Sequence, residues 1–103
     1  IALIDENMPV IAIAPNDDLL EKLKSNLQEV KSRGSQMIVF EDENSKVQSM
    51  DAMKIIPITS NLGRITAPII FTIPLQLLSY HVALEKNTDV DKPRNLAKSV
   101  TVE

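Results

Sequence analysis

A lysine near the carboxyl end is the residue of this sequence best suited to covalent chemistry. Lys98 lies in a polar segment, residues 89–103, among apolar neighbours that include Leu96 and Val100. A lysine amine acts as a nucleophile or as a carbonyl partner when burial or a neighbouring cation lowers its pKa. Arg94 is a candidate neighbour, one turn away if the segment is locally helical. The same residues are also compatible with a solvated terminus, which the composition alone favours.

Acidic residues form a second candidate site. Asp17 and Asp18 follow an apolar run and stand at the start of an expected helix. Two carboxylates there satisfy the helix N-terminus and repel a phosphate, so we predict a helix cap and no phosphate site. Together with Asp42 they have the chemistry of a Mg²⁺ site. However, only one strand and one helix separate them from Asp42, where a receiver-type site needs a further unit, so we expect residues 41–43 to form a solvated loop.

Other reactive residue types are scarce. The sequence has no cysteine, which excludes disulfides, thiolate metal sites and a cysteine nucleophile. The one histidine, His81, has no second histidine to share a metal, and Glu85 is the only carboxylate at helical spacing from it. We therefore expect His81 to be structural, and the chain to need no metal and no cofactor.

Length, charge and composition limit the class of protein. The 103 residues suffice for one domain or a piece of one. A formal net charge of −3 and only three aromatic residues argue against a nucleic-acid partner. We see no apolar run approaching the roughly 18 residues that cross a bilayer, so we expect no membrane association and a cytoplasmic protein.

The expected elements begin with two buried strands around a helix. Residues 8–14 and 36–41 are apolar runs typical of strands covered on both faces. Between them, leucines recur at helical spacing. Asn16 or Asp18 can cap this helix, Glu21 stands three residues after Asp18 as in a capping box, and Gly34 offers a left-handed C-terminal cap. This βαβ unit, followed by a shorter strand at residues 54–58, predicts an α/β fold with a parallel sheet.

The second half is harder to interpret because two prolines interrupt an apolar stretch. We expect a helix from Pro74 to Lys86, with Pro74 in its first turn and Pro68 opening a short turn before it. The chain opens on Ile1 without an initiator methionine, a helix cap or a turn before it. We therefore expect it to be a fragment.

The last fifteen residues, DVDKPRNLAKSVTVE, closely resemble the C-terminus of the glucosamine-6-phosphate synthase family, the isomerising glutamine–fructose-6-phosphate aminotransferases. Residues 74–83 (PLQLLSYHVA), 8–16 (MPVIAIAPN) and 19–26 (LLEKLKSN) are also similar to that family. The resemblance covers most of the chain and weakens between residues 41 and 66.

The resemblance implies the last part of the second sugar isomerase (SIS) subdomain, a flavodoxin-like αβα unit, at residues 1–88, and an active-site tail at residues 89–103. In that family, the lysine matching Lys98 meets the sugar carbonyl, and the alanine matching Ala97 contacts the sugar through its backbone. The implied partners are fructose 6-phosphate, a glutaminase domain of the same parent chain and a second copy of the parent enzyme. The family's other catalytic groups lie upstream, so this piece alone is expected to be inactive. The alternative is a non-catalytic SIS module that senses sugar phosphates.

Overall fold

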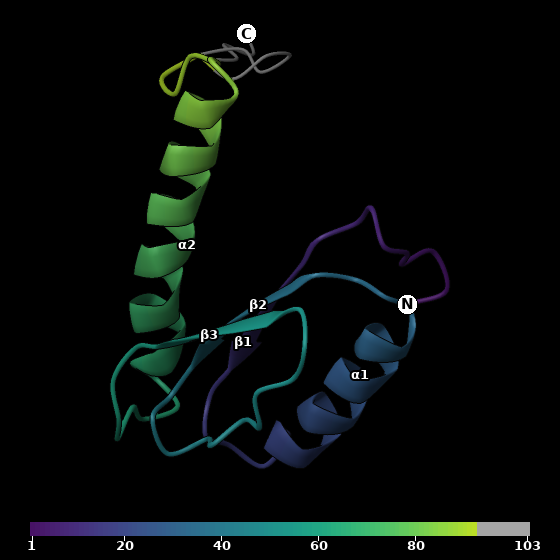
Figure 1. The fold of residues 1–103 in the computed structure, drawn as a ribbon. Helices are drawn as coiled ribbons and strands as arrows, with labels where there is room; N and C mark the ends of the chain where they lie inside the picture. The colour runs from purple at the N-terminus through teal and green to yellow at the C-terminus, as the bar shows by residue number, and fades with distance from the viewer. Residues whose placement is uncertain (93–103) are drawn as a thin grey trace, which may run out of the picture. The chain divides into compact units, whose positions relative to one another are not determined.

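The structure, a computed structural model, describes residues 1–92 of the chain. Five elements follow one another (Figure 1): β1 (Val10–Ala14), α1 (Leu20–Ser32), β2 (Met37–Glu41), β3 (Met53–Pro57) and α2 (Ala67–Glu85). The chain divides into two compact units, Ile1–Phe71 and Thr72–Glu103. All three strands and α1 belong to the first unit.

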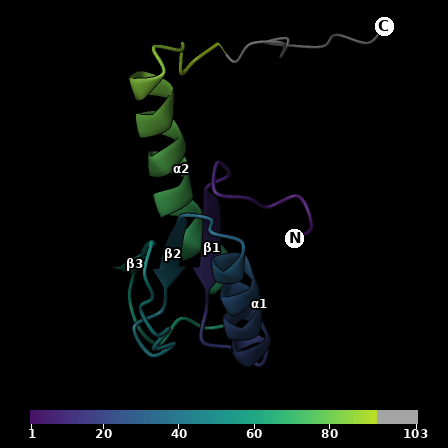
Figure 2. The ribbon, with the colours of Figure 1, turned by 45° about the vertical axis from the view of Figure 1, so that its right-hand side comes forward.

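The three strands form one parallel sheet in the order β1, β2, β3. Val39 in the middle of β2 pairs with Ala12 of β1 and with Ile55 of β3. The turned view shows the strands side by side with α1 beside them (Figure 2). The predicted βαβ unit and the α/β fold class are therefore confirmed.

The core of the first unit lies between α1 and one face of the sheet. Strand residues alternate between faces, so Ala12 and Ala14 share one face of β1. They cluster there with Val39 of β2 and with Leu27 and Val30 of α1. Burial of this stripe explains why the leucine periodicity predicts the helix correctly.

The opposite face of β1 corrects one expectation. Ile11 and Ile13 are 48% and 36% exposed, so β1 is not covered on both faces by the described residues. The sequence of β1 is apolar on both faces, which is typical of a strand buried on both sides. Whether the second face is buried depends on the surrounding elements and not on the sequence of the strand itself.

Both ends of α1 are closed by local hydrogen bonds, but not as the capping box predicts. The side chain of Leu19, the residue before the helix, makes no capping bond, and Asp17 Oδ1 accepts the Leu19 N–H at 2.9 Å in an Asx turn. Asp18 forms an ion pair with Arg64. At the other end, Gly34 adopts φ +78° and its N–H donates to the Lys31 carbonyl at 2.9 Å, which confirms the predicted left-handed cap.

Replacing Gly34 with Ala is expected to lower the free energy of unfolding by about 1–2 kcal/mol, because a Cβ disfavours the left-handed conformation. An added Cβ would lie 3.7 Å from Glu6 Cβ, an ordinary contact, so the cost lies in the backbone and not in a clash. Thermal denaturation checks this. Gly34→Asn is the control, since asparagine tolerates this conformation better; an equal loss in both variants would refute the backbone explanation.

Helix α2 begins earlier than expected. The structure has one continuous helix from Ala67 to Glu85 with Pro74 inside it, so the predicted short turn at Pro68 and start at Pro74 are wrong. Pro68 is the second helical residue, where no intrahelical N–H bond is required. Pro74 removes one interior bond, and the remaining helix tolerates this loss.

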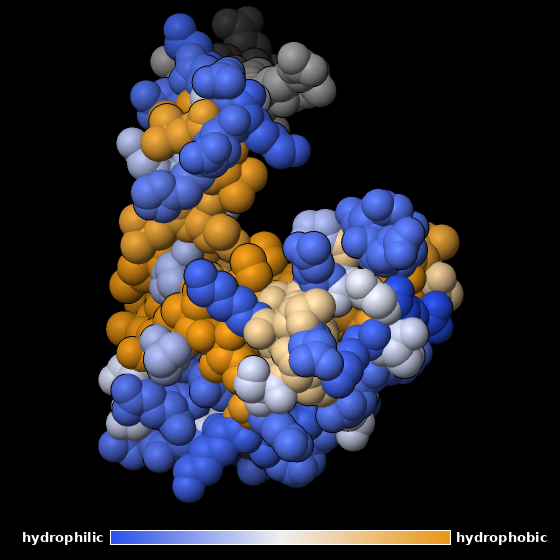
Figure 3. All heavy atoms as spheres, viewed as in Figure 1, coloured by the Kyte–Doolittle hydropathy of each residue, from blue (hydrophilic) through white to orange (hydrophobic). Residues whose placement is uncertain are grey.

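Helix α2 is apolar on most of its surface. Apolar side chains gather along it in the space-filling view (Figure 3), and Ile69, Ile73 and Leu77 are at least half exposed. By length and composition alone the helix could cross a membrane, and 11% of its 18-residue apolar stretch is buried among the described residues. This corrects the expectation that no apolar segment is long enough, although core helices of globular domains can be as long and as apolar.

Candidate functional site

The predicted site residues Lys98 and Ala97 lie outside the described residues, and so does Arg94. The structure does describe the segment that joins α2 to them. We call residues 86–92 the tail root. It belongs entirely to the second unit of the chain.

A Schellman motif ends α2 at the start of the tail root. Asn87 adopts φ +53°, and its N–H donates to the Leu84 carbonyl at 2.9 Å. The Thr88 N–H donates to the Ala83 carbonyl at 2.9 Å, and the Thr88 hydroxyl donates to the same oxygen at 3.0 Å. Thr88 therefore donates two hydrogen bonds to the Ala83 carbonyl oxygen, one from its backbone N–H and one from its hydroxyl.

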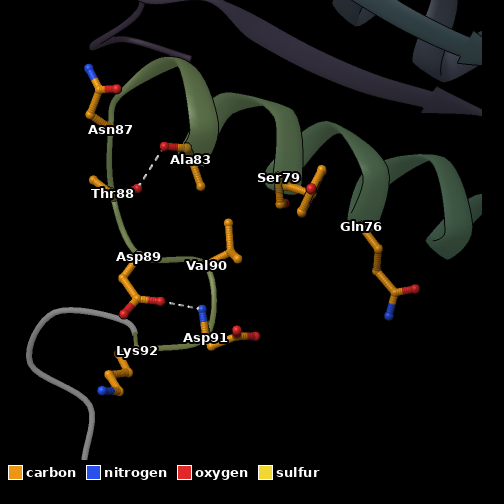
Figure 4. Close-up of a pocket in the computed structure, with 10 residues that line it drawn as sticks. Gln76, Ser79, Ala83, Asn87, Thr88, Asp89, Val90, Asp91 and Lys92 are labelled. Carbon is orange, nitrogen blue, oxygen red and sulfur yellow. Dashed lines mark hydrogen bonds between the residues drawn. The ribbon is translucent and has the colours of Figure 1, made fainter.

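An Asx turn follows directly. Asp89 Oδ1 accepts the Asp91 N–H at 2.9 Å. The close-up shows both contacts, with the Val90 side chain pointing back toward the helix (Figure 4). The residues of the tail root and the last turns of α2 line an open pocket: Gln76, Ser79, Tyr80, Ala83, Asn87, Thr88, Asp89, Val90, Asp91 and Lys92. The chain thus leaves α2 through two consecutive hydrogen-bonded turns.

The carboxyl ends of the strands form the second candidate region, since parallel strands end at one edge of a sheet. Asp17 and Asp18 follow β1 there, and Arg64 lies between β3 and α2. The ion pair of Arg64 with Asp18 joins these two loops, and both side chains are more than 80% exposed. The prediction that the acidic pair caps the helix is thus replaced by an Asx turn and an exposed ion pair.

Asp42 corrects the expectation of a solvated loop. It is 2% exposed, and its Oδ1 accepts the Asn44 N–H at 2.8 Å. The Asp42 N–H donates to the Ala14 carbonyl at 3.0 Å, and the buried Ser45 hydroxyl donates to the same oxygen at 2.8 Å. Glu41 Oε2 accepts the Val47 N–H at 2.9 Å. The Asp42 and Glu41 carboxylates therefore accept N–H groups of the turn after β2, while the Asp42 N–H and the Ser45 hydroxyl join this turn to the end of β1.

Removing the Ser45 hydroxyl is expected to lower the free energy of unfolding by about 0.5–1.5 kcal/mol, the usual net worth of one hydrogen bond. Ser45→Ala leaves the Ala14 carbonyl with the Asp42 N–H, so no buried acceptor is orphaned. Hydrogen exchange of the β1 and β2 amides measures the loss. The control is Ser25→Ala, whose exposed hydroxyl donates to the Glu21 carbonyl; a loss as large as that of Ser45→Ala would contradict the prediction.

No group of three or more metal-ligating side chains occurs within residues 1–92. Within these residues, Asp17 and Asp18 form no such group with Asp42. His81 stacks edge-on against Tyr80, with ring centroids 5.4 Å apart and an angle of 79° between the rings. The structural role of His81 stays a prediction.

Sequence reasoning did not find the roles of Arg64, Thr88 and Asp89. Nothing in the sequence pairs Arg64 with Asp18, because 46 positions separate them. The sequence of the tail root could have predicted its turns. Asparagine favours the left-handed conformation that ends a helix, and threonine and aspartate side chains often accept hydrogen bonds from, or donate them to, the backbone of a turn.

Comparisons with known proteins identify the family. The SIS domain model matches residues 1–86. The isomerising glutamine–fructose-6-phosphate aminotransferases of Shewanella oneidensis, Pectobacterium atrosepticum and Escherichia coli K12 are 63%, 61% and 60% identical to the chain over all 103 residues. The chain spans 17% of the length of each of these relatives.

A solved structure agrees with the sequence comparison. The C-terminal domain of glucosamine-fructose-6-phosphate aminotransferase from Francisella tularensis matches 88% of the chain and 26% of its own length, with a TM-score of 0.79 and 50% identity. The resemblance to the C-terminal region of these aminotransferases is thereby confirmed. The SIS match includes α2, so the apolar helix is an element of the matched domain. Because the family model covers most of its length, the chain belongs to the SIS domain family.

Proposed function

We propose that the chain is the C-terminal part of the isomerase half of an enzyme that makes glucosamine 6-phosphate from fructose 6-phosphate and glutamine-derived ammonia. The observation that carries this proposal is the identity of 55–63% over the whole chain to several proteins of that name. The match to these proteins spans all 103 residues and so includes residues 89–103, which lie beyond the SIS match. A module that had kept only the fold would have no reason to keep the tail.

In this proposal Lys98 engages the carbonyl of the sugar during ring opening and imine formation, and the backbone of Ala97 contacts the sugar. An amine is the one side-chain group that forms an imine with a ketose carbonyl and releases it again by hydrolysis. We divide the chain into SIS residues 1–88 and an active-site tail at residues 89–103. The described tail root supports this division, because the helix closes at residues 86–88 and the chain then turns.

The phosphate of the sugar binds outside this chain in our proposal. The start of α1, where a parallel α/β sheet commonly binds an anion, carries Asp17 and Asp18, and an ion pair already engages Arg64 there. The partners are thus the remainder of the isomerase half, a glutaminase domain of the same parent and a second copy of the parent enzyme. The reaction needs no metal and no cofactor, and we place it in the cytoplasm.

An assay of the full-length protein that contains this chain tests the proposal. With fructose 6-phosphate and glutamine, we expect glucosamine 6-phosphate to accumulate, detected by mass spectrometry, with [amide-¹⁵N]glutamine as the nitrogen source. Omission of either substrate is the control. Binding of fructose 6-phosphate without any product, in a parent that carries a DNA-binding helix-turn-helix in place of a glutaminase domain, would overturn the proposal in favour of a sugar-phosphate sensor.

A further inference from the structure

The tail root is the last described part of the chain before the proposed reacting lysine. Lys98 follows Lys92 by six residues. Because an extended residue spans at most about 3.6 Å, Lys98 stays within roughly 22 Å of the end of the tail root. The place of Lys92 therefore limits where the amine can act.

The hydrogen bonds of the tail root set that place. If its turns opened, the nearest helical residue would be Glu85, the last residue of α2, thirteen residues before Lys98. The local concentration of a tethered group falls roughly as the −3/2 power of the tether length. Lengthening the tether from six to thirteen residues would thus dilute the amine about threefold, before any loss of direction is counted.

We propose that the tail root is a positioning device for the C-terminal tail, with Thr88 and Asp89 as its positioning residues. This inference rests on the proposed function. The Thr88 hydroxyl closes the end of α2 by its bond to the Ala83 carbonyl, and the Asp89 carboxylate turns the next residues by its bond to the Asp91 N–H. Neither residue touches the reacting atoms in this proposal; both act through the position from which the tail departs.

Side-chain burial does not account for these contacts. All residues of the tail root are exposed, so neither bond satisfies a buried group. Removing them therefore leaves no unpaired buried atom and no cavity, and the domain is expected to remain folded. A change in the reaction rate of such a variant would then report the positioning of the tail and not a loss of folded protein.

The test uses the full-length protein with the double substitution Thr88→Val and Asp89→Ala. Valine keeps the shape of threonine without the hydroxyl, and alanine removes the turn acceptor. We expect kcat to fall about threefold to tenfold, consistent with two weakened hydrogen bonds, while KM for fructose 6-phosphate changes less. Thr88→Ser with Asp89→Asn keeps both bonding groups and is expected to restore kcat. Ser25→Ala, which removes an exposed hydroxyl bond to the Glu21 carbonyl in α1, is the matched control.

A second readout separates positioning from misfolding. Borohydride reduction in the presence of fructose 6-phosphate traps the imine at Lys98. We expect the double variant to form adduct more slowly but to reach the same final number of adducts per chain. A lower final number at an unchanged rate would mean that part of the protein is misfolded, and would overturn the inference. Unchanged kcat and unchanged trapping rate would overturn it as well. If the parent enzyme itself forms no adduct at Lys98, the proposed role of that lysine fails instead.

Discussion

Lys98→Arg in the full-length protein is expected to lower the rate of glucosamine 6-phosphate formation by more than about 100-fold, within the range that a positioned catalytic side chain contributes. Arginine keeps the positive charge and much of the length of lysine, but its delocalised guanidinium does not form an imine and does not give up a proton near neutral pH. A loss of activity with charge retained would therefore identify the amine, and not the charge, as the required group. Product formation is measured with saturating fructose 6-phosphate and glutamine.

The matched control is Lys54→Arg, an exposed position on β3 outside the proposed site. This variant should keep the full rate. Peptide mass spectrometry after borohydride treatment should find the sugar adduct on the peptide that contains Lys98 in the unsubstituted protein and on no peptide of the Lys98→Arg variant. Retained product formation in Lys98→Arg would remove the lysine from the mechanism.

Leu27→Ala is expected to destabilise the first unit by about 2–5 kcal/mol, the range for a truncated leucine in a well-packed core. Leu27 is 2% exposed and belongs to the cluster that joins α1 to the sheet, with Ala12, Val39 and Val30 among its members. Its truncation removes apolar contacts and leaves a cavity in the middle of that interface. Hydrogen exchange of α1 amides reports the local free energy of opening, and a lower melting temperature should accompany it.

The neighbouring position gives the control for this prediction. Gln28 is exposed on α1, so Gln28→Ala should change stability by less than about 0.5 kcal/mol. If both substitutions accelerated exchange of the α1 amides equally, the cluster around Leu27 would not be what holds the helix to the sheet.

The order and type of the first four elements follow from the sequence, because each carries a strong local signal. Two β-branched apolar runs flank a helix with an apolar stripe, and the same stripe becomes the face that packs on the sheet. Gly34 marks the end of that helix for a local reason as well, since its backbone needs a positive φ. The proposed roles of Lys98 and Ala97 also came from the sequence alone, through the resemblance of the tail.

Long-range contacts decided the features that local patterns misjudged. Asp18 has the composition of a cap, but the loop before α2 brings Arg64 to it, and the ion pair takes the place of the capping bond. Asp42 stands in a charged run that looks solvated, yet the parallel pairing of β1 with β2 places it beside the Ala14 carbonyl and buries it. The start of α2 was missed because a proline inside an apolar stretch usually indicates the end of a helix. Pro68 is the second residue of α2, where a proline costs little because its missing N–H would have no partner within the helix.

The sequence by itself therefore determined the parallel α/β framework and the family resemblance. Apolar periodicity, the glycine that ends α1 and the family-like residues 89–103 are all patterns of residues that are close together in the sequence. Only the tertiary structure decided which polar groups meet at the carboxyl edge of the sheet and how the chain leaves α2 toward the tail. Those contacts depend on strand register and on the backbone geometry at the end of a helix. Neither can be read from residue types, because both depend on which backbone atoms come together in the folded chain.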